Sequence, residues 1–317
     1  MRIAALRGRE AFQVEETEIP AIAPDEVLVR VVGSGVCASE LEAWLDGPPP
    51  GEVRYPGHEV SGVVDRVGAE ATGISVGDRM GVWVTERGFA EYVAVKAAYC
   101  FPVGDGSLEE ALAEPIACAT NAVEAADVRL GDDVVVIGAG FMGNLVQSLV
   151  ALRGVRRLIV ADARQDALDR AAKIGADRIV DVTLESLPDV VGSLTDGRGA
   201  DITFECTGTQ PALVACGETT RMSGTIAIVG FHQGTDRQIP LAAWNWMAFR
   251  IVNAHFRDLA VILRGMSVGT RLLASGALSM DGLVTHRFPL ERINEAFAAL
   301  RDKPAGFAKA VITFPEG

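Results

Sequence analysis

The chain has 317 residues, a formal net charge of −13 and a hydrophobic fraction of 49%. This length and hydrophobic content predict about two folded domains and exclude global disorder. The acidic balance and the absence of any long run of Lys or Arg argue against a nucleic-acid partner, because binding to a phosphate backbone requires clustered positive charge.

The sequence gives no sign of membrane insertion or export. No stretch is long and apolar enough to span a bilayer, and the N-terminus carries charges where a signal peptide needs an apolar stretch. The five cysteines are scattered and odd in number, which favours reduced thiols or a metal ligand over a disulfide framework. We therefore expect a cytoplasmic protein without a membrane partner.

The first part of the chain predicts a β domain. Runs rich in Val and Gly indicate short strands, and turn sequences such as that at 74–78 separate them. The predicted strands lie at 27–36, 60–68, 78–84 and 89–95. We expect these strands to form a compact domain of the β-barrel type.

From about residue 117 the pattern changes to alternating strands and helices. Apolar strands at 134–137 and 158–161 flank a helix at 143–153, which is typical of a βαβ unit with a parallel sheet. Further strands are predicted at 200–208 and 224–230, helices at 257–275 and 291–301, and a last strand at 309–314. The fold class expected is therefore α/β, with a doubly wound sheet in the second domain.

The segment 138–143 reads G-x-G-x-x-G and follows an apolar strand directly before a helix. In a dinucleotide site Gly138 allows the tight turn, Gly140 lets the backbone approach the pyrophosphate, and Gly143 lets helix and strand pack closely. We predict cofactor binding by these glycines and by Phe141 and Met142 between them. The alternative is a tight β–α connection without a ligand, which the complete strand, turn, helix and acid pattern disfavours.

Asp162 ends the next predicted strand, where a carboxylate would accept hydrogen bonds from the adenosine ribose. The same carboxylate would repel a 2′-phosphate, so the sequence favours NAD over NADP. Arg164, two residues on, weakens this preference because a guanidinium tolerates a phosphate.

Three segments of the chain carry metal-ligating residue types. Cys37 lies just after a predicted strand, His58 and Glu59 just before another, and Glu114 at the domain junction. A thiolate, an imidazole and a carboxylate that converge make a tetrahedral zinc site with one open position. Taken singly, a Cys is usually a small buried hydrophobe and a His a core residue, so their order along the chain carries the prediction.

Seven short motifs, taken together and in this order, resemble the zinc-dependent medium-chain alcohol dehydrogenase family. They are GVCASE (35–40), GHE (57–59), GDR (77–79), GFAEY (88–92), EPIAC (114–118), GAGFMG (138–143) and ECTG (205–208). The resemblance covers essentially the whole chain. It implies a GroES-like catalytic domain over 1–116 and 254–317 and a Rossmann cofactor domain over 117–253.

The resemblance also implies roles for single residues. Cys37 and His58 would bind the catalytic zinc, with Glu59 or Glu114 as the third ligand; Glu114 at its position is typical of the polyol and threonine dehydrogenase branches. Ser39 would bond the substrate oxygen and relay its proton. Lys309 would lie near the cofactor pyrophosphate. The family's lobe of four cysteines for a structural zinc is missing here, so we expect one zinc per subunit.

These roles predict hydride transfer between a secondary alcohol and NAD, with a polyol, cyclitol, sugar or amino alcohol as the substrate. Trp83 and His232 are the residues we expect to contact the substrate, and the tryptophan-bearing segment 241–256 predicts a homodimer or homotetramer. Two alternatives stay open: a zinc-free, NADPH-dependent quinone or enoyl reductase of the same superfamily, and a non-catalytic dinucleotide-binding protein.

Overall fold

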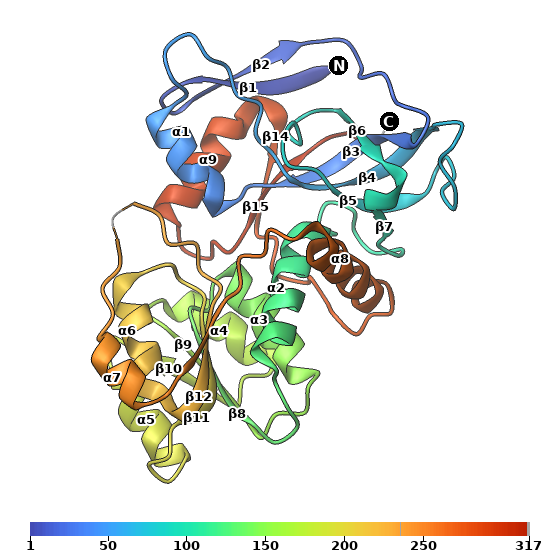
Figure 1. Cartoon of the computed structure of the whole chain (residues 1–317). Helices are drawn as coiled ribbons and strands as arrows, with labels where there is room; N and C mark the ends of the chain where they lie inside the picture. Colours follow the sequence, from blue (N-terminus) through green and yellow to red (C-terminus); the bar gives the residue numbers. More distant parts are fainter. Residues whose placement is uncertain (235, 316–317) are drawn as a thin grey trace. The chain divides into compact units, whose positions relative to one another are not determined.

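A computed structural model describes residues 1–234 and 236–315, which form two compact units (Figure 1). Unit 1 consists of Met1–Ala117 and Leu263–Gly317, and unit 2 of Cys118–Ile262. The second boundary lies at 262/263, whereas the sequence placed it at 253/254. The difference has a physical reason, because Ala254 donates to the Ile228 carbonyl and Val261 accepts from Asn121, so the segment stays bonded to unit 2. The last two residues of the predicted catalytic domain, 316 and 317, lie outside the described residues.

Unit 1 is built on a seven-stranded sheet. Its strand order is β14-β15-β3-β4-β5-β7, and β6 also pairs with β3. A separate hairpin of β1 (Arg2–Gly8) and β2 (Ala11–Glu16) begins the chain. The sheet strands are β3 (Glu26–Gly35), β4 (Glu59–Val67), β5 (Arg79–Trp83), β6 (Tyr92–Lys96), β7 (Cys100–Pro102), β14 (His286–Pro289) and β15 (Ala310–Thr313). The strands predicted for the first domain are therefore present.

The core of unit 1 joins the two ends of the chain. The ring of Phe297 lies 5.0 Å from that of Phe12, 5.6 Å from that of Trp44 and 5.9 Å from that of Phe89. Phe297 belongs to α9 (Ile293–Asp302) and Trp44 to α1 (Leu41–Asp46). Such aromatic contacts stabilise by burial, and the contact with Phe89 also has edge-to-face geometry, so the C-terminal helix closes the β domain of the N-terminal segment.

Unit 2 is a six-stranded parallel sheet with the order β10-β9-β8-β11-β12-β13. From the centre of the sheet, the strands β8, β9 and β10 follow one another toward one edge, and β11, β12 and β13 follow one another toward the other edge. This is the doubly wound arrangement. Its strands are β8 (Asp133–Ile137), β9 (Arg157–Asp162), β10 (Arg178–Asp181), β11 (Ala200–Glu205), β12 (Thr220–Ile228) and β13 (Arg250–Asn253). The predicted fold class, a GroES-like domain plus a Rossmann-type sheet, is confirmed.

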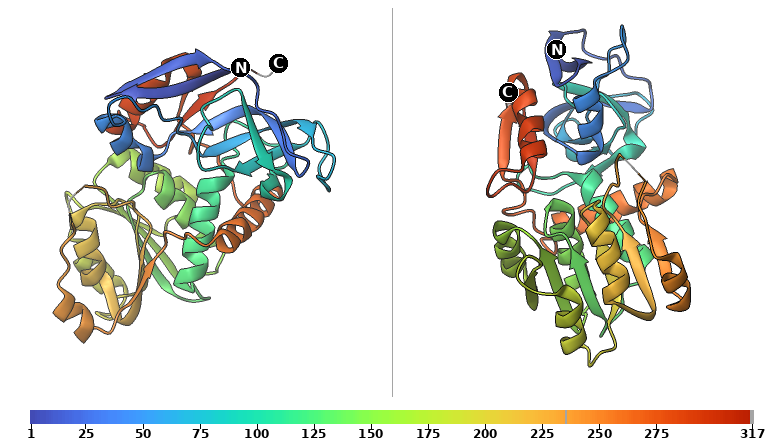
Figure 2. Two further views of the ribbon diagram at one scale, coloured as in Figure 1. Left: turned by 45° about the horizontal axis from the view of Figure 1, so that its top comes forward. Right: turned by 90° about the vertical axis from the view of Figure 1, so that its left-hand side faces the viewer.

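Helices cover both faces of this sheet (Figure 2). Helices α3 (Phe141–Ala151) and α4 (Gln165–Ile174) pack together on one face, and α5 (Leu187–Leu194) and α6 (Gln210–Thr219) pack together on the other. Right-handed crossovers require this division, because the strands advance in opposite directions on the two sides of β8. All five residues of β8 are buried, as the predicted continuous apolar run requires.

Three further helices complete the described chain. They are α2 (Ala113–Ala126) and α8 (Leu259–Ala274), which cross the two unit boundaries in the sequence, and α7 (Leu241–Trp246) before the edge strand β13. Among the described residues, no helix has both the length and the apolar character that crossing a membrane requires.

Candidate functional site

In unit 1 the ends of two neighbouring strands bring three metal-ligating side chains together. Cys37 follows β3, and His58 and Glu59 stand at the start of β4, which pairs with β3 in antiparallel register. One ligand atom from each of these three residues lies within 4.8 Å of the others. The separation suits donors that surround a single ion, since Zn–S and Zn–N bonds are about 2.0–2.3 Å long.

The side chain of Glu59 has room for its carboxylate because the residue opposite it on β3 is a glycine. Gly35 pairs with Glu59, and a Cβ at Gly35 would lie 1.9 Å from Glu59 Oε2. On its other side Glu59 pairs with Trp83 of β5. Directly opposite residues of antiparallel strands point to the same face of the sheet, so the half-buried Trp83 shares the face of the metal-ligating group.

Glu40 fixes the orientation of His58. Its Oε1 lies 3.0 Å from His58 Nδ1 and accepts a 2.6 Å hydrogen bond from the Gly57 N–H. Because an ionised carboxylate only accepts hydrogen bonds, Nδ1 carries the proton and Nε2 is left to bind a metal. In the metal-free protein burial lowers the pKa of His58, but Cys37 and Glu40 outweigh it and raise the pKa to about 12, so Nε2 has to release a proton when a metal binds. The sequence did not predict this role for Glu40, although its position three residues after Cys37 places it in the same turn.

Lys309 lies beside the carboxylate of Glu59. Its Nζ lies 2.7 Å from Glu59 Oε1 and 2.6 Å from Glu59 Oε2, and only 5% of the residue is exposed. Burial lowers the pKa of Lys309, but the charges of Glu59, Cys37 and Glu114 together raise it. The structure shows its ammonium beside the Glu59 carboxylate, inside unit 1, and the expected place near the cofactor pyrophosphate stays a prediction.

Two more predicted residues can now be placed. Ser39 is exposed and donates from Oγ to Cys37 Sγ at 3.2 Å, so its hydroxyl adjoins the predicted metal. Glu114, in the first turn of α2, is half-buried and is not among the described residues that meet within 4.8 Å. Of the two candidates for third ligand, the geometry supports Glu59.

The donor set of Cys37, His58 and Glu59 fits zinc. One soft thiolate, one imidazole with its other nitrogen already bonded, and one carboxylate are ligands that zinc takes in three-ligand sites with an open fourth position. Glu59 Oε2 is buried and accepts no hydrogen bond of normal geometry from the described residues. A metal ion would satisfy this oxygen.

In unit 2 the glycine turn has the geometry of a phosphate-binding loop. Gly138 has φ +103°, which favours glycine, and a Cβ on Gly143 would lie 1.7 Å from the Gly138 carbonyl oxygen. A Cβ on Gly140 would meet nothing within 4 Å, so the backbone at the start of α3 is open to a ligand. Phe141 is buried and Met142 is half-buried, so a dinucleotide would meet chiefly the backbone of this loop.

Asp162 lies next to this loop at the end of β9. Its Oδ2 accepts a 2.7 Å hydrogen bond from the Ala139 N–H, and its Oδ1 accepts one of 2.9 Å from the Arg164 N–H. The structure therefore brings the predicted ribose-binding acid and the glycine turn together, as a dinucleotide site requires.

His232 does not present a free ring nitrogen to a substrate. Its Nε2 lies 2.9 Å from Oε2 of the buried Glu205, and its Nδ1 accepts a 3.1 Å hydrogen bond from Arg237 Nε. Glu205 also accepts from the backbone N–H groups of Thr207 and Gly208. His232 thus holds the loops at the carboxyl ends of β11 and β12, and the expected substrate contact has no support from this geometry.

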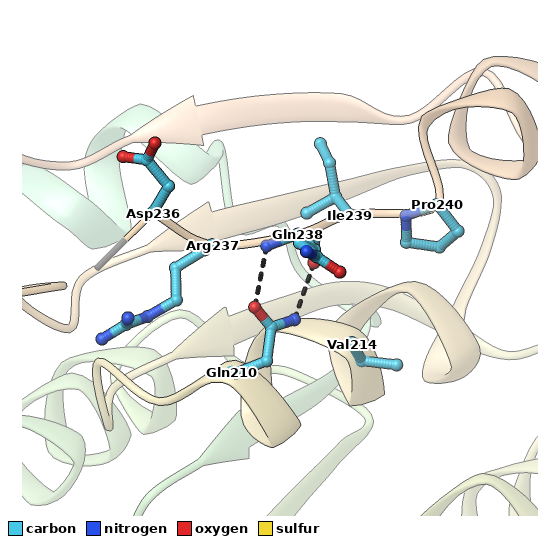
Figure 3. Close-up of a pocket in the computed structure, with 7 residues that line it drawn as sticks. All are labelled: Gln210, Val214, Asp236, Arg237, Gln238, Ile239 and Pro240. Atoms are coloured by element: carbon cyan, nitrogen blue, oxygen red, sulfur yellow. Dashed lines mark hydrogen bonds between the residues drawn. The ribbon is translucent and has the colours of Figure 1, made fainter.

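Unit 2 has a pocket of about 590 Å³. Gln210 and Val214 of α6 and residues 236–240 line it (Figure 3). The Gln210 side chain donates to the Gln238 carbonyl at 2.6 Å and accepts from the Gln238 N–H at 2.8 Å. These bonds fasten the segment to α6. None of the predicted site residues lines this pocket.

Two family models match the chain. Residues 23–105 match the alcohol dehydrogenase GroES-like domain, and residues 142–266 match the zinc-binding dehydrogenase domain. The first covers β3 to β7 and includes the proposed metal ligands of the β domain, and the second begins inside the glycine turn.

Named relatives align over nearly the whole chain. A sorbitol dehydrogenase of Gallus gallus is 30% identical, over 90% of this chain and 89% of the relative. An L-threonine 3-dehydrogenase of Ruegeria pomeroyi is 27% identical, over 95% of this chain and 96% of the relative. The crystal structure of 2R,3R-butanediol dehydrogenase from Bacillus subtilis superimposes with a TM-score of 0.84 at 25% identity, over 99% of each chain.

Proposed function

The chain belongs to the zinc-binding alcohol dehydrogenase family and is an oxidoreductase, and from this premise we propose that it oxidises a polyol or an amino alcohol with NAD. The reverse reaction, reduction of the corresponding carbonyl compound, uses the same groups. The names of the relatives support this substrate class, since sorbitol is a polyol and threonine an amino alcohol.

The observation that carries the proposal is the convergence of Cys37, His58 and Glu59 within 4.8 Å beside the hydroxyl of Ser39. These three residues would hold one zinc ion per subunit. Zinc bound there supplies Lewis acidity, which favours loss of a proton from a substrate hydroxyl. The remaining chemistry falls to side chains of this chain.

Ser39 would accept the hydroxyl proton of the substrate and pass it on, because its Oγ is exposed and adjoins the ligand Cys37. The Glu40 carboxylate bonds Nδ1 of His58, which leaves Nε2 of the same ring directed away from Glu40. Lys309 balances the charge of Glu59. Trp83 supplies an apolar wall on the face of Glu59 and would limit the bulk of the substrate.

The cofactor proposed is NAD. Gly138, Gly140 and Gly143 would admit the pyrophosphate, and Asp162 would bond the adenosine ribose from its place beside the loop. NAD supplies the hydride acceptor, and the protein supplies orientation. Zinc-free reduction of quinones with NADPH is the competing activity, and the intact set of metal-ligating side chains disfavours it.

We further propose a homodimer or homotetramer. The edge strand β13 and the neighbouring helix α7 expose large apolar side chains, with Leu241 55%, Trp246 80% and Ile251 45% exposed. A strand at the edge of a sheet that exposes such side chains is a suitable surface for association with a second copy. A cytoplasmic location is consistent with the five free cysteines.

The experiment that tests the proposal is a substrate screen with purified protein. NAD reduction is followed by the absorbance of the reduced nicotinamide against polyols, cyclitols, sugar alcohols and amino alcohols. We expect turnover with at least one of these classes and its loss on treatment with a zinc chelator. Quinone reduction with NADPH that survives chelation, with no alcohol oxidised, would contradict the proposal. A Trp246→Ser variant measured by light scattering tests the assembly, with a smaller particle expected.

A further inference from the structure

Four charged side chains gather at the end of β9, where the adenosine ribose is proposed to bind. Asp162 ends the strand, Arg164 precedes α4, Asp166 lies in the first turn of that helix, and Arg170 follows one turn later. Two carboxylates and two guanidinium groups give this cluster no formal net charge. Its internal pairing therefore decides which charges are available to a cofactor.

Arg164 is held by Asp166. Arg164 Nε donates to Asp166 Oδ1 at 3.1 Å, and Arg164 Nη2 donates to Asp166 Oδ2 at 2.5 Å. The side chains are 30% and 31% exposed, so the pair is partly shielded from water. Two parallel bonds between a guanidinium and a carboxylate fix the position of both groups. The sequence suggested that Arg164 could receive a phosphate, but here its guanidinium already binds a carboxylate of the same turn.

Asp166 also acts on the second arginine. Burial lowers the pKa of Arg170, and the positive charge of Arg164 lowers it further. The carboxylates of Asp166 and Asp162 oppose this effect, but the pKa stays below its usual value. The four groups thus interact electrostatically: the carboxylate of Asp166 is hydrogen-bonded to Arg164 and also stabilises the charge of Arg170. The carboxylate of Asp162 is directed to the backbone of the glycine turn and of Arg164.

NADP differs from NAD by a phosphate on the adenosine ribose, and guanidinium groups are the side chains best suited to bind it. To bind this phosphate, a guanidinium that already makes two hydrogen bonds to a carboxylate has to break them, or has to divide its N–H groups between the carboxylate and the phosphate. Both alternatives cost free energy. We propose that Asp166 is a second determinant of cofactor choice beside Asp162, because it holds the Arg164 guanidinium and withholds it from the 2′-phosphate of NADP.

This inference rests on the proposed use of NAD, and its test measures the binding of both cofactors directly. Dissociation constants for NAD and NADP are measured by titration calorimetry on wild type, Asp162→Ala, Asp166→Asn and the double variant. Asp162→Ala alone is expected to improve NADP binding about tenfold by removing repulsion. Adding Asp166→Asn is expected to improve it about tenfold more, while NAD binding changes less than about threefold.

Three further variants separate release of Arg164 from a general disturbance of the helix. Asp166→Glu in the Asp162→Ala background keeps the carboxylate and should give no further gain for NADP. Arg164→Ala in the double variant should remove the gain. Asp169→Asn is the matched control. The carboxylate that it removes belongs to the same helix and accepts a hydrogen bond from Gln165. It should leave the ratio of the two constants unchanged.

The outcomes are distinct. A gain for NADP that requires both Asp166→Asn and Arg164 supports the inference. If wild type binds NAD and Asp166→Asn leaves the ratio unmoved in the Asp162→Ala background, or shifts both constants equally, Asp166 is a structural residue and the inference is wrong. A wild type that binds neither dinucleotide overturns the proposed function, and this inference with it.

Discussion

Among the residues that the structure describes, each unit buries one glutamate, and the two are bonded in different ways. Glu59 in unit 1 is 1% exposed and Glu205 in unit 2 is 0% exposed. The Glu205 carboxylate accepts two backbone N–H groups and the Thr207 hydroxyl and contacts His232, so both oxygens are bonded. Glu59 has the ammonium of Lys309, and its Oε2 accepts no normal hydrogen bond from the described residues.

The difference separates a structural carboxylate from a ligand. Burying a carboxylate is costly unless its oxygens find donors, cations or a metal. Protein groups satisfy Glu205 fully, and its effect is to fix the loops after β11 and β12. Glu59 pairs with the Lys309 ammonium and lies next to a thiol and an imidazole, which is the environment that we propose for a metal ligand. Variants of the two units should therefore respond in different ways.

The largest effect is expected for Cys37→Ala. Loss of the thiolate removes one of three metal ligands, and loss of Lewis-acid stabilisation of several kcal/mol corresponds to a fall in kcat of about 10³-fold or more. Zinc content, measured by atomic absorption, should fall with it. NAD affinity should stay within about threefold, because the glycine turn belongs to unit 2. Cys100→Ala is the control, since its thiol hydrogen-bonds only the Lys96 carbonyl among the described residues. Equal loss in both variants would contradict the metal assignment.

Glu59→Gln should lower both zinc affinity and stability. In the metal-free protein the buried Lys309 would lose its counter-charge, which costs about 3–5 kcal/mol of unfolding free energy. Urea unfolding after chelation measures this loss. The pair substitution Glu59→Gln with Lys309→Met should recover part of it because no buried charge remains. If the double variant is no more stable than the single one, the ion pair is not the source of the loss.

Glu205→Ala should lower stability without affecting zinc. The substitution leaves the buried Gly208 N–H, the partly buried Thr207 N–H and His232 without their acceptor, at a cost of about 3 kcal/mol. Urea unfolding should show the loss, and metal analysis should still find the zinc content of wild type. A fall in zinc content would mean that the two buried glutamates are not independent.

The smallest effect concerns Asp201, at the opposite end of β11 from Glu205. Burial raises the pKa of Asp201, but hydrogen bonds from Arg198 and Arg221 and the Asp133 N–H hold it below its usual range. A carboxyl whose pKa is lowered on folding stabilises the protein above its unfolded pKa of about 3.9 and loses that contribution as the pH falls.

Asp201→Asn should therefore cost about 2 kcal/mol at pH 7, and the gap from wild type should shrink below about pH 4. Urea unfolding at several pH values measures both curves. Parallel curves between pH 7 and pH 3 would show that the ionised carboxylate of Asp201 does not contribute the stability assigned to it.

The residues of the proposed dinucleotide site were easier to find in the sequence than those of the proposed metal site. Gly138 to Gly143 are contiguous, and Asp162 ends the strand that immediately follows α3, so one βαβ unit contains the whole pattern. Parallel pairing of β8 with β9 then brings the two carboxyl ends together. What the pattern did not reveal is the pairing of Arg164 with Asp166, because side-chain ion pairs within a turn depend on rotamers rather than on residue type alone.

The metal site shows the opposite situation. Cys37, His58, Glu59 and Glu114 were predicted as residue types with the third ligand left open. The convergence that supports Glu59 depends on the register of β3 against β4. Lys309 lies 250 residues from Glu59 in the sequence. It comes directly before β15, and β15 pairs with β3, which in turn pairs with β4, the strand of Glu59. No local pattern encodes such a contact. The family resemblance assigned Lys309 to the cofactor, and the ion pair with Glu59 became visible only in the structure.

The most direct test of the account is a zinc titration of chelated protein with activity as the readout. Zinc is removed, then added back in known equivalents while NAD reduction is measured with an alcohol found in the substrate screen. The account predicts that activity falls to the baseline and returns in proportion to added zinc, up to about one ion per chain. Full activity in the metal-free protein, or a requirement for a second zinc, would contradict the site built by Cys37, His58 and Glu59.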